Sequence, residues 1–302
     1  MQDLFLKGLP TECRSFLMDK LPHRVEKVAV LRERKQHAVY RIYTQKDSFV
    51  LKCFQPQSVA KEIQVYDLLQ ENKIPTLPCY GITDNALLLE DLESSESWRC
   101  ADERDMKLST TGEAVANWYR RLHTVGFEVV RNAEETIGYL QSWIGIIQQK
   151  AMEIVGNTLE VADSGSWKLA LSSFEALKEK YQSFPQTFNY NDFAAENLAL
   201  SATHQREEQA IVYDYDQFGV GAIYSDWRNV TYSLQEGARD AFVAAYGEVS
   251  ESERRIDNVL SILQGLIIAV DRDRFPNWAL PLRKSIENGE LERKIYAALE
   301  IL

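Results

Sequence analysis

The sequence predicts an α+β protein of two lobes, a small β-rich lobe followed by a larger, mainly helical lobe. Short runs of β-branched and aromatic residues dominate residues 1–95, whereas apolar residues recur at helical spacing through most of residues 96–302. A chain of 302 residues with 45% hydrophobic content can bury a large core. We therefore expect residues 1–95 and 96–302 to form two domains.

Residues 28–31, 39–43 and 48–54 are expected to be strands, because each run is rich in β-branched and aromatic residues. Alternation along the third run places Lys52 on the same face as Val50. A lysine on an otherwise apolar strand face requires a partner, since burying an unpaired ammonium group is costly.

Residues 58–72 are predicted to form a helix, because apolar residues recur at helical spacing and Ser58 suits the N-cap position. A further strand is expected at residues 87–89, and the polar segment 93–105, which lacks periodicity, is the candidate linker. The elements expected after it are helices around 115–122, 137–155 and 169–181, short strands between 188 and 220, and helices beyond 226 with breaks near Pro276 and Gly289.

The net charge of −11 is unevenly distributed along the chain. Residues 1–95 hold 13 basic and 13 acidic side chains, so all of the net charge belongs to residues 96–302. An acidic chain does not suit a nucleic acid partner, whose phosphates need a basic surface. The acidic field of the larger lobe would attract a cationic small molecule, although it is also what a merely soluble surface would show.

No apolar run approaches the roughly 20 residues that span a bilayer, and the N-terminus lacks the basic start and apolar stretch of a signal peptide. We therefore expect a cytoplasmic protein without a membrane partner. The four cysteines, Cys13, Cys53, Cys79 and Cys100, show no metal-binding spacing. They are expected to be reduced thiols that pack as small apolar residues.

The residues that suit chemistry are concentrated between 188 and 214. Asp192 and Asn197 stand five residues apart in a polar segment, and residues 211–213 are predicted to be a strand that delivers Asp214. Phosphoryl transfer from ATP needs Mg²⁺ on oxygen ligands and a carboxylate beside the acceptor hydroxyl. Asp192 as the base, with Asn197 and Asp214 as metal ligands, supplies both requirements.

This pattern resembles the motifs of the aminoglycoside phosphotransferase and choline kinase-like family, which has a two-lobed protein kinase-like fold. The matching segments are Tyr190-Asn191-Asp192 with Asn197, then residues 212–215, then Ser225-Asp226-Trp227. The resemblance implies that Asp192 is the catalytic carboxylate and that Asn197 and Asp214 bind Mg²⁺. It also implies that Asp226 is buried and accepts hydrogen bonds from the catalytic loop.

The same resemblance gives Lys52 a role. The run from Phe49 to Lys52 is similar to the kinase strand whose lysine reaches the α- and β-phosphates of ATP, with Val50 against the adenine. Glu62, on the helix that follows, is then the partner of this lysine. Its carboxylate would supply the counter-charge that a lysine on an apolar strand face requires.

Residues 89–92 resemble the kinase hinge, where the carbonyl of Glu90 and the amide of Leu92 would face the adenine. Leu122 and His123 match a Leu-His pair that is common in the family's first large-lobe helix. The resemblance covers residues 28–235. The ordered succession of these motifs is more specific than any one of them.

Two departures from the family pattern bear on activity. Tyr190 stands where the family usually has histidine, and the loop of residues 32–38 contains no glycine. Glycine-rich loops let backbone amides approach phosphates, so Arg34 or Lys35 would have to supply charge, unless the loop is only a solvated hairpin tip. A catalytically degenerate, nucleotide-binding regulatory protein on the same fold is therefore the alternative function.

The resemblance implies an ATP-dependent phosphotransferase that moves the γ-phosphate to a hydroxyl of a small acceptor. We expect this acceptor to be cationic or amine-bearing, aminoglycoside-like or choline-like. Asp271, Asp273 and Trp278 either line a pocket for such a cation or belong to a solvated acidic turn. The identity of the acceptor and the oligomeric state do not follow from the sequence.

Overall fold

The structure, a computed structural model, describes residues 6, 8–21, 23–34, 37–55, 60–132, 137–202 and 208–302. Contacts between Cα atoms divide the chain into two compact units. Unit 1 comprises residues 1–121, 192–218 and 230–246, and unit 2 comprises residues 122–191, 219–229 and 247–302. These boundaries differ from the expected one near residue 95, and the two lobes 1–95 and 96–302 stay a prediction.

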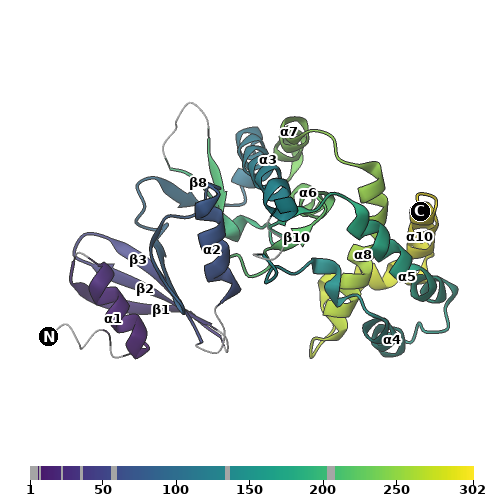
Figure 1. Ribbon diagram of the computed structural model, residues 1–302, viewed down its shortest axis with the longest axis horizontal. Coiled ribbons are helices and arrows are strands. Elements are labelled where there is room, and N and C mark those ends of the chain that lie inside the picture. The colour runs from purple at the N-terminus through teal and green to yellow at the C-terminus, as the bar shows by residue number, and fades with distance from the viewer. Residues whose placement is uncertain are drawn as a thin grey trace. The chain divides into compact units, whose positions relative to one another are not determined.

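A five-stranded antiparallel sheet forms the first part of unit 1 (Figure 1). Its strands are β1 (Val25–Glu33), β2 (His37–Thr44), β3 (Ser48–Phe54), β4 (Cys79–Thr83) and β5 (Ala86–Glu90), in the spatial order β1-β2-β3-β5-β4. The four predicted strands are confirmed as β1, β2, β3 and β5. The sequence did not predict β4, because this short run contains a glycine and follows two prolines, which obscure the strand pattern.

Helix α1 (Thr11–Lys20), which the sequence did not predict, covers one face of the sheet (Figure 1). Its Leu17 joins a core that contains Ile42 of β2 and Leu51 of β3. Because side chains alternate along a strand, burial of Leu51 against α1 directs Lys52 to the other face. Helix α2 (Lys61–Glu71) confirms the predicted helix, and its expected N-cap, Ser58, lies outside the described residues.

A small sheet and further helices complete unit 1. The sheet has the order β6-β8-β9, formed by β6 (Trp98–Cys100), β8 (Leu198–Ser201) and β9 (Ala210–Val212), so the expected linker at 93–105 contains a strand. The helices are η2 (Asp105–Lys107), α3 (Ser109–Asn132), which continues into unit 2, η4 (Ala195–Asn197) and α7 (Glu236–Tyr246). Gly112 allows α3 to approach α7 closely, since a Cβ at this position would lie 2.0 Å from the carbonyl oxygen of Ala238.

Helices dominate unit 2. They are η3 (Trp143–Ile146), α4 (Gln149–Thr158), α5 (Gly165–Ser183), α6 (Tyr224–Ser233), α8 (Glu251–Val270), η5 (Asn277–Ala279), α9 (Leu280–Glu287) and α10 (Glu290–Leu299). The last residues of α6 belong to unit 1. Two short strands, β7 (Thr187–Asn189) and β10 (Gly219–Gly221), pair with each other. Trp167 of α5, Leu260 of α8 and Ile295 of α10 share one core. The single helix expected over 137–155 is wrong, because two glycines interrupt this stretch and α4 begins only at Gln149.

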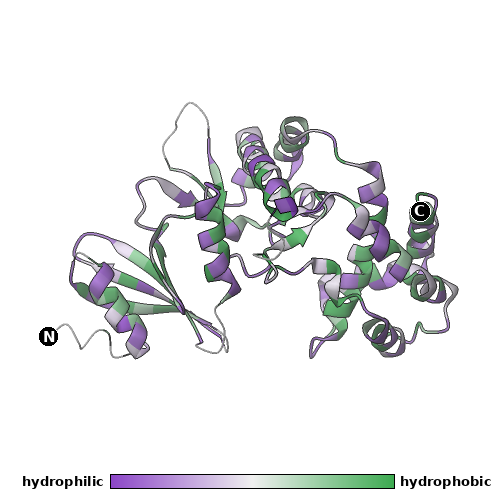
Figure 2. Cartoon of the chain, viewed as in Figure 1, coloured by the Kyte–Doolittle hydropathy of each residue, from purple (hydrophilic) through white to green (hydrophobic). Residues whose placement is uncertain are grey.

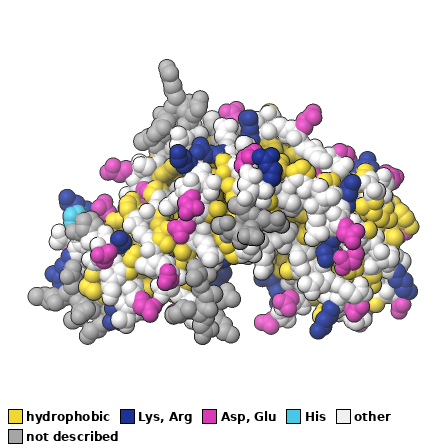
Figure 3. Space-filling model, viewed as in Figure 1, with side chains coloured by type: hydrophobic (Ala, Val, Ile, Leu, Met, Phe, Trp, Pro, Cys, Tyr) yellow, Lys and Arg dark blue, Asp and Glu magenta, His cyan; other side chains and the backbone are white. Residues whose placement is uncertain are grey.

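A helix that spans a membrane needs both length and apolarity. None of the helices among the described residues is both long and apolar enough to cross a bilayer. Figure 2 shows hydrophobic and hydrophilic residues mixed along the helices and strands. Figure 3 shows acidic and basic side chains scattered over the face in view.

Candidate active site

Lys52 lies in the middle of β3, opposite Val39 of β2 and Leu87 of β5. Its side chain is almost completely buried. The ammonium group contacts the carboxylate of Glu62, from α2, and donates a hydrogen bond to Oδ1 of Asp214 at 2.9 Å. The structure therefore brings together three predicted site residues that come from three separate motifs.

Carboxylates keep Lys52 charged in spite of its burial. Burial by itself would lower the pKa of Lys52, but the negative charges of Glu62, Asp214 and Asp216 outweigh this effect and raise the pKa. Burial raises the pKa of Glu62, and the positive charge of Lys52 opposes that shift. The other Glu62 oxygen accepts the backbone N–H of Tyr215 at 3.4 Å, so one carboxylate binds both the lysine and the segment after Asp214.

A pocket of about 630 Å³ opens beside Lys52 within unit 1. The predicted site residues that line it are Val50, Lys52, Glu62, Glu90, Leu92, Asn197 and Asp214. The remaining predicted residue, Asp192, is hydrogen-bonded to one of them, Asn197. Seven of the eight residues predicted to bind nucleotide or metal or to act in catalysis thus line one cavity of unit 1, and the eighth, Asp192, is bonded to one of them.

Asp91 anchors the predicted hinge, although the sequence did not single it out as a site residue. Its buried carboxylate accepts a hydrogen bond from Ser48 Oγ at 2.5 Å and pairs with Nε of Arg41 at 2.7 Å. Arg41 pairs in addition with Glu93 at 2.5 Å. Because Arg41 lies opposite Val50 in the sheet, these contacts tie the hinge to the strands that form the pocket wall.

Asp192 and Asn197 are joined by two hydrogen bonds. Asn197, at the end of η4, donates from Nδ2 to the carbonyl oxygen and to Oδ2 of Asp192, each at 3.0 Å. Loss of hydration and the negative charge of Asp214 raise the pKa of Asp192, while the bond from Asn197 opposes the shift. A raised pKa suits a carboxylate that takes up a proton during a reaction.

Asp226 is fully buried in unit 2 and accepts the backbone N–H groups of two loop residues. Its Oδ2 accepts from Tyr190 and its Oδ1 from Asn191, both at 2.8 Å. His123 Nε2 lies 3.2 Å from the same Oδ2. The expected hydrogen bonds from the loop to Asp226 are confirmed, and the buried Tyr190 occupies the position where the family usually has histidine.

Asp214 belongs to a cluster of carboxylates. It follows β9 with a φ of 65°, a left-handed conformation that is rare for residues other than glycine. Carboxylate oxygens of Glu62, Asp214 and Asp216 lie within 4.8 Å of one another. With the side-chain amide oxygen of Asn197, they are the kind of donors that Mg²⁺ prefers, so the residues present fit this metal. Sequence reasoning missed Asp216, whose only signal is its place two residues after Asp214.

The glycine-free loop supplies two pocket residues that the sequence did not select. Arg32 of β1 and His37 of β2 line the same pocket as Lys52. Burial and the positive charge of Lys52 lower the pKa of His37. Of the two residues expected to supply charge, Arg34 is exposed and its backbone N–H donates to the carbonyl oxygen of His37, whereas Lys35 lies outside the described residues.

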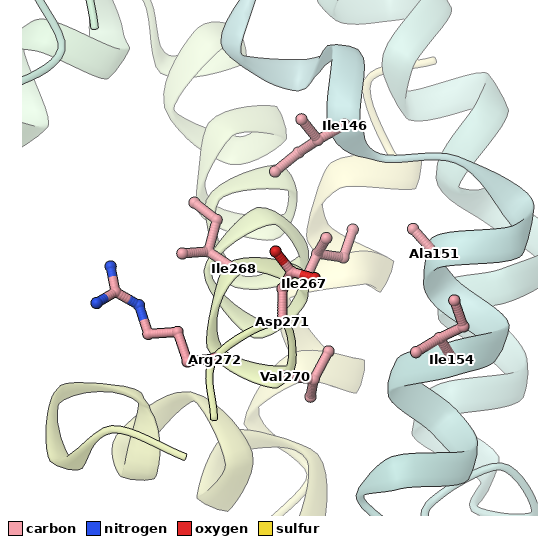
Figure 4. A pocket seen from close by; sticks show the side chains of 8 residues that line it. All are labelled: Ile146, Ala151, Ile154, Ile267, Ile268, Val270, Asp271 and Arg272. Carbon is pink, nitrogen blue, oxygen red and sulfur yellow. The ribbon is translucent and has the colours of Figure 1, made fainter. Parts of the chain in front are cut away.

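Unit 2 contains a second pocket, of about 590 Å³ and largely apolar (Figure 4). It is lined by Ile146, Ala151, Ile154, Ile267, Ile268, Val270, Asp271 and Arg272. In Figure 4 the side chain of Arg272 extends away from Ala151 and Ile154 on α4. Of the three residues expected around a cation, Asp271 therefore lines a pocket, while Asp273 and Trp278 are not among its lining residues.

In unit 1, the buried Lys52 is paired with two carboxylates beside a pocket. This arrangement is typical of proteins that bind nucleoside phosphates and transfer a phosphoryl group. The model of the phosphotransferase enzyme family matches residues 28–257, and the chain belongs to this family. No curated protein matches it by sequence.

Solved structures agree on the fold. A spectinomycin phosphotransferase in complex with ADP and spectinomycin has a TM-score of 0.59 at 12% identity, over 95% of this chain and 97% of that chain. A choline kinase from Streptococcus pneumoniae has a TM-score of 0.58 at 14% identity, over 95% and 98% of the two chains. An ethanolamine kinase from Plasmodium vivax has a TM-score of 0.59 at 11% identity, over 97% and 95%. The predicted α+β, protein kinase-like fold is confirmed.

Proposed function

We propose that the protein transfers the γ-phosphate of ATP to a hydroxyl group of a small, amine-bearing molecule. The observation that carries this proposal is the contact of buried Lys52 with both Glu62 and Asp214 at the wall of the pocket. A fixed positive charge beside a set of oxygen donors suits the binding and stabilisation of phosphate groups. Membership of the phosphotransferase enzyme family supports the same class of reaction.

Different residues of the pocket contact the adenine, the phosphates and the metal ion of bound ATP. Val50 packs against the adenine, whose edge faces the carbonyl of Glu90 and the amide of Leu92. Lys52, held by Glu62, stabilises the α- and β-phosphates. Asn197 and Asp214, with Asp216 beside them, would hold Mg²⁺, which when bound supplies positive charge to neutralise the phosphates.

Asp192 acts on the acceptor. Asn197 holds Oδ2 of Asp192, so Oδ1 is the atom offered to the acceptor hydroxyl. The hydroxyl donates to this oxygen, which orients it toward the γ-phosphate. The same oxygen receives the hydroxyl proton as the new P–O bond forms and the bond from the γ-phosphorus to the bridging oxygen breaks, which releases ADP. The raised pKa of Asp192 supports this role, because a more basic carboxylate is a better proton acceptor.

Arg32 and His37 take over the phosphate contacts that glycine amides make in a glycine-rich loop. Both line the pocket with Lys52. Arg32→Ala is expected to weaken ADP binding about tenfold, which corresponds to one charge-assisted hydrogen bond, and to leave adenosine binding unchanged. Calorimetry with adenosine, AMP and ADP checks this. An equal loss for adenosine would show that Arg32 supports the adenine site instead.

The proposed acceptor carries an amine. The net charge of −11 lies in residues 96–302, which favours a cation. The names of the similar structures include choline, ethanolamine and spectinomycin, all of which bear amine or ammonium groups beside hydroxyls.

A screen of Mg²⁺-dependent ADP release over aminoglycosides, amino alcohols, sugars and nucleosides tests the reaction. Once the screen has identified an acceptor, Asp192→Asn is expected to lower kcat for its phosphorylation at least 100-fold, because the general base is lost. The Kd for ATP should change less than about threefold, since Asp192 contributes no charge to nucleotide binding in this mechanism. Asp240→Asn, an exposed carboxylate on α7 in the same unit, is the matched control and should retain full activity. Undiminished turnover in Asp192→Asn would contradict the mechanism.

The second candidate is a regulatory protein that binds nucleotide without turnover. The glycine-free loop and the buried Tyr190 favour it, because both depart from the pattern of active family members. Tight ATP binding together with no phosphorylated acceptor and no ATP hydrolysis across the whole screen would establish this alternative.

A further inference from the structure

Two thiols meet in the core between α1 and the sheet. Cys13 lies on α1 and Cys53 on β3, 40 residues further along the chain, and their Sγ atoms are 2.6 Å apart. The side chains are 1% and 4% exposed. Their neighbours in this core include Leu17 and Leu51, so each sulfur has the other as its polar contact in apolar surroundings.

The contact makes the two sulfurs chemically unequal. The hydrogen bond between the two sulfurs lowers the pKa of Cys13, although burial opposes this shift. The same hydrogen bond, with burial, raises the pKa of Cys53. Cys13 is therefore the sulfur that more readily becomes a thiolate, which is the reactive form in thiol–disulfide exchange.

We propose that Cys13 and Cys53 are an oxidisable pair that forms a disulfide and so cross-links α1 to β3. The oxidant is a low-molecular-weight disulfide such as oxidised glutathione. The Cys13 thiolate attacks one sulfur of the oxidant and releases one glutathione thiolate, which leaves a mixed disulfide on Cys13. Cys53 then loses its proton and attacks Cys13 Sγ, and the second glutathione leaves. Two protein thiols are oxidised, and the small disulfide is reduced to two thiols.

Burial of the pair sets the conditions for this reaction. An oxidant reaches Cys13 only when α1 moves off the sheet, because the thiol is covered in the closed state. Once formed, the disulfide prevents that opening. It would close a loop of 40 residues that contains β1 and β2, which restricts the unfolded chain and stabilises the folded one. Cys53 directly follows Lys52, so the cross-link also fixes the strand that carries the site lysine.

The other two cysteines provide the controls. Cys100 is exposed, with its Sγ 3.7 Å from the hydroxyl of Tyr213, and Cys79 is partly exposed on β4. Accessibility alone would therefore predict that oxidised glutathione reacts at Cys100 rather than at the buried pair. The full chain carrying Cys100→Ser removes this competing thiol, and the variant Cys13→Ser in the same background removes the pair.

The test incubates both proteins with oxidised glutathione and measures thiols after denaturation, peptides after non-reducing digestion, and Tm. In the Cys100→Ser protein we expect two thiols to disappear, a peptide linking Cys13 to Cys53 to form, and Tm to rise by about 5 °C or more until a reductant is added. The protein with Cys13→Ser should lose no thiol pair and show no rise in Tm. If this variant does not fold, Cys53→Ala takes its place.

Three results would overturn the proposal. They are a stable glutathione adduct on Cys13 without the cross-link, a link from either residue to Cys79, and no loss of thiols over the time in which α1 exchanges its amide hydrogens. The last comparison matters because hydrogen exchange measures the opening that admits the oxidant. None of these measurements depends on nucleotide or acceptor, so the proposal stands apart from the proposed phosphotransfer.

Discussion

Single charged residues in unit 1 have partners that determine both stability and the proposed chemistry. Glu62 contacts Lys52 with one oxygen and the backbone of Tyr215 with the other. Removal of one charge from such a buried group leaves its partner with less counter-charge in a medium of low polarity. The effects of substitutions at these positions should therefore exceed those of exposed carboxylates.

Glu62→Gln preserves the size of the side chain and removes its charge. Lys52 then keeps only Asp214 as an ion pair, and we expect kcat/KM for ATP to fall about 10- to 100-fold, equivalent to about 1.4–2.7 kcal/mol. The free energy of unfolding should fall by about 1–3 kcal/mol, and not by more, since Asp214 still pairs with Lys52. The control is Glu71→Gln at the exposed end of α2, which should change neither quantity appreciably. Wild-type kcat/KM in Glu62→Gln would mean that Lys52 does not depend on this carboxylate.

Asp105 is expected to make stability depend on pH. Arg99 donates two hydrogen bonds to this buried carboxylate, at 2.6 and 2.7 Å, and they lower the pKa of Asp105 in the folded protein. Because the unfolded pKa is about 3.9, the stabilisation by charged Asp105 is complete above that pH. It is lost as the pH falls from there through the lower pKa of the folded state.

Asp105→Asn should therefore lower the free energy of unfolding by about 1–3 kcal/mol at pH 7, with a difference that shrinks below about pH 4. Urea unfolding at a series of pH values measures this difference. Glu103→Gln, an exposed neighbour, should show no such trend. Because Asn has nearly the same shape as Asp, a destabilisation that persists undiminished at pH 2.5 would assign the effect of Asp105 to its hydrogen bonds with Arg99 rather than to its charge.

At the scale of helices and strands, close approach decides which positions tolerate change. In α3, a methyl group on Gly112 would lie 2.0 Å from the carbonyl oxygen of Ala238, which belongs to α7. Backbone cannot yield as a flexible side chain does, so the two helices would have to move apart.

Gly112→Ala is therefore expected to lower the free energy of unfolding by about 1–3 kcal/mol, measured by denaturant titration. The substitution would raise stability by about 0.5–1 kcal/mol at an unobstructed helical position. Gly165→Ala is the control, because a Cβ at this first residue of α5 would meet nothing within 4 Å. If both variants gain stability, α3 and α7 do not pack as described.

The elements that the sequence predicted well are those with local signals. The predicted strand 48–54 has the same bounds as β3, because the alternation and the aromatic and β-branched residues both favour a strand there. The segment 137–155 contains enough apolar residues to resemble one helix, but its glycines favour turns, and the helix starts only at Gln149. Helix α1 was missed, since its residues face a core whose other half lies in strands far along the chain.

For the molecule as a whole, the order of motifs was sufficient to predict the fold and seven of the residues that line the pocket. Their contacts were not predictable from spacing, because they join positions far apart in the chain. Asp216 becomes a candidate ligand only when its carboxylate lies beside Glu62, and Arg41 becomes part of the hinge only when it pairs with Asp91. The roles of the site residues and the boundary near residue 95 stay predictions.

The discontinuity of unit 1 has a consequence for a chain emerging from the ribosome. Lys52 and its distant partner Asp214 are separated by 162 positions, so at a translation rate of about 5–20 residues per second the lysine waits on the order of 10–30 s for that carboxylate. The sheet and α2 can form during this interval, with Glu62 as the interim counter-charge. A messenger truncated between codons 90 and 214 would then encode a chain that contains β1 to β5 and Glu62 but lacks Asp214 and Asp216, two of the three carboxylates of the acidic cluster.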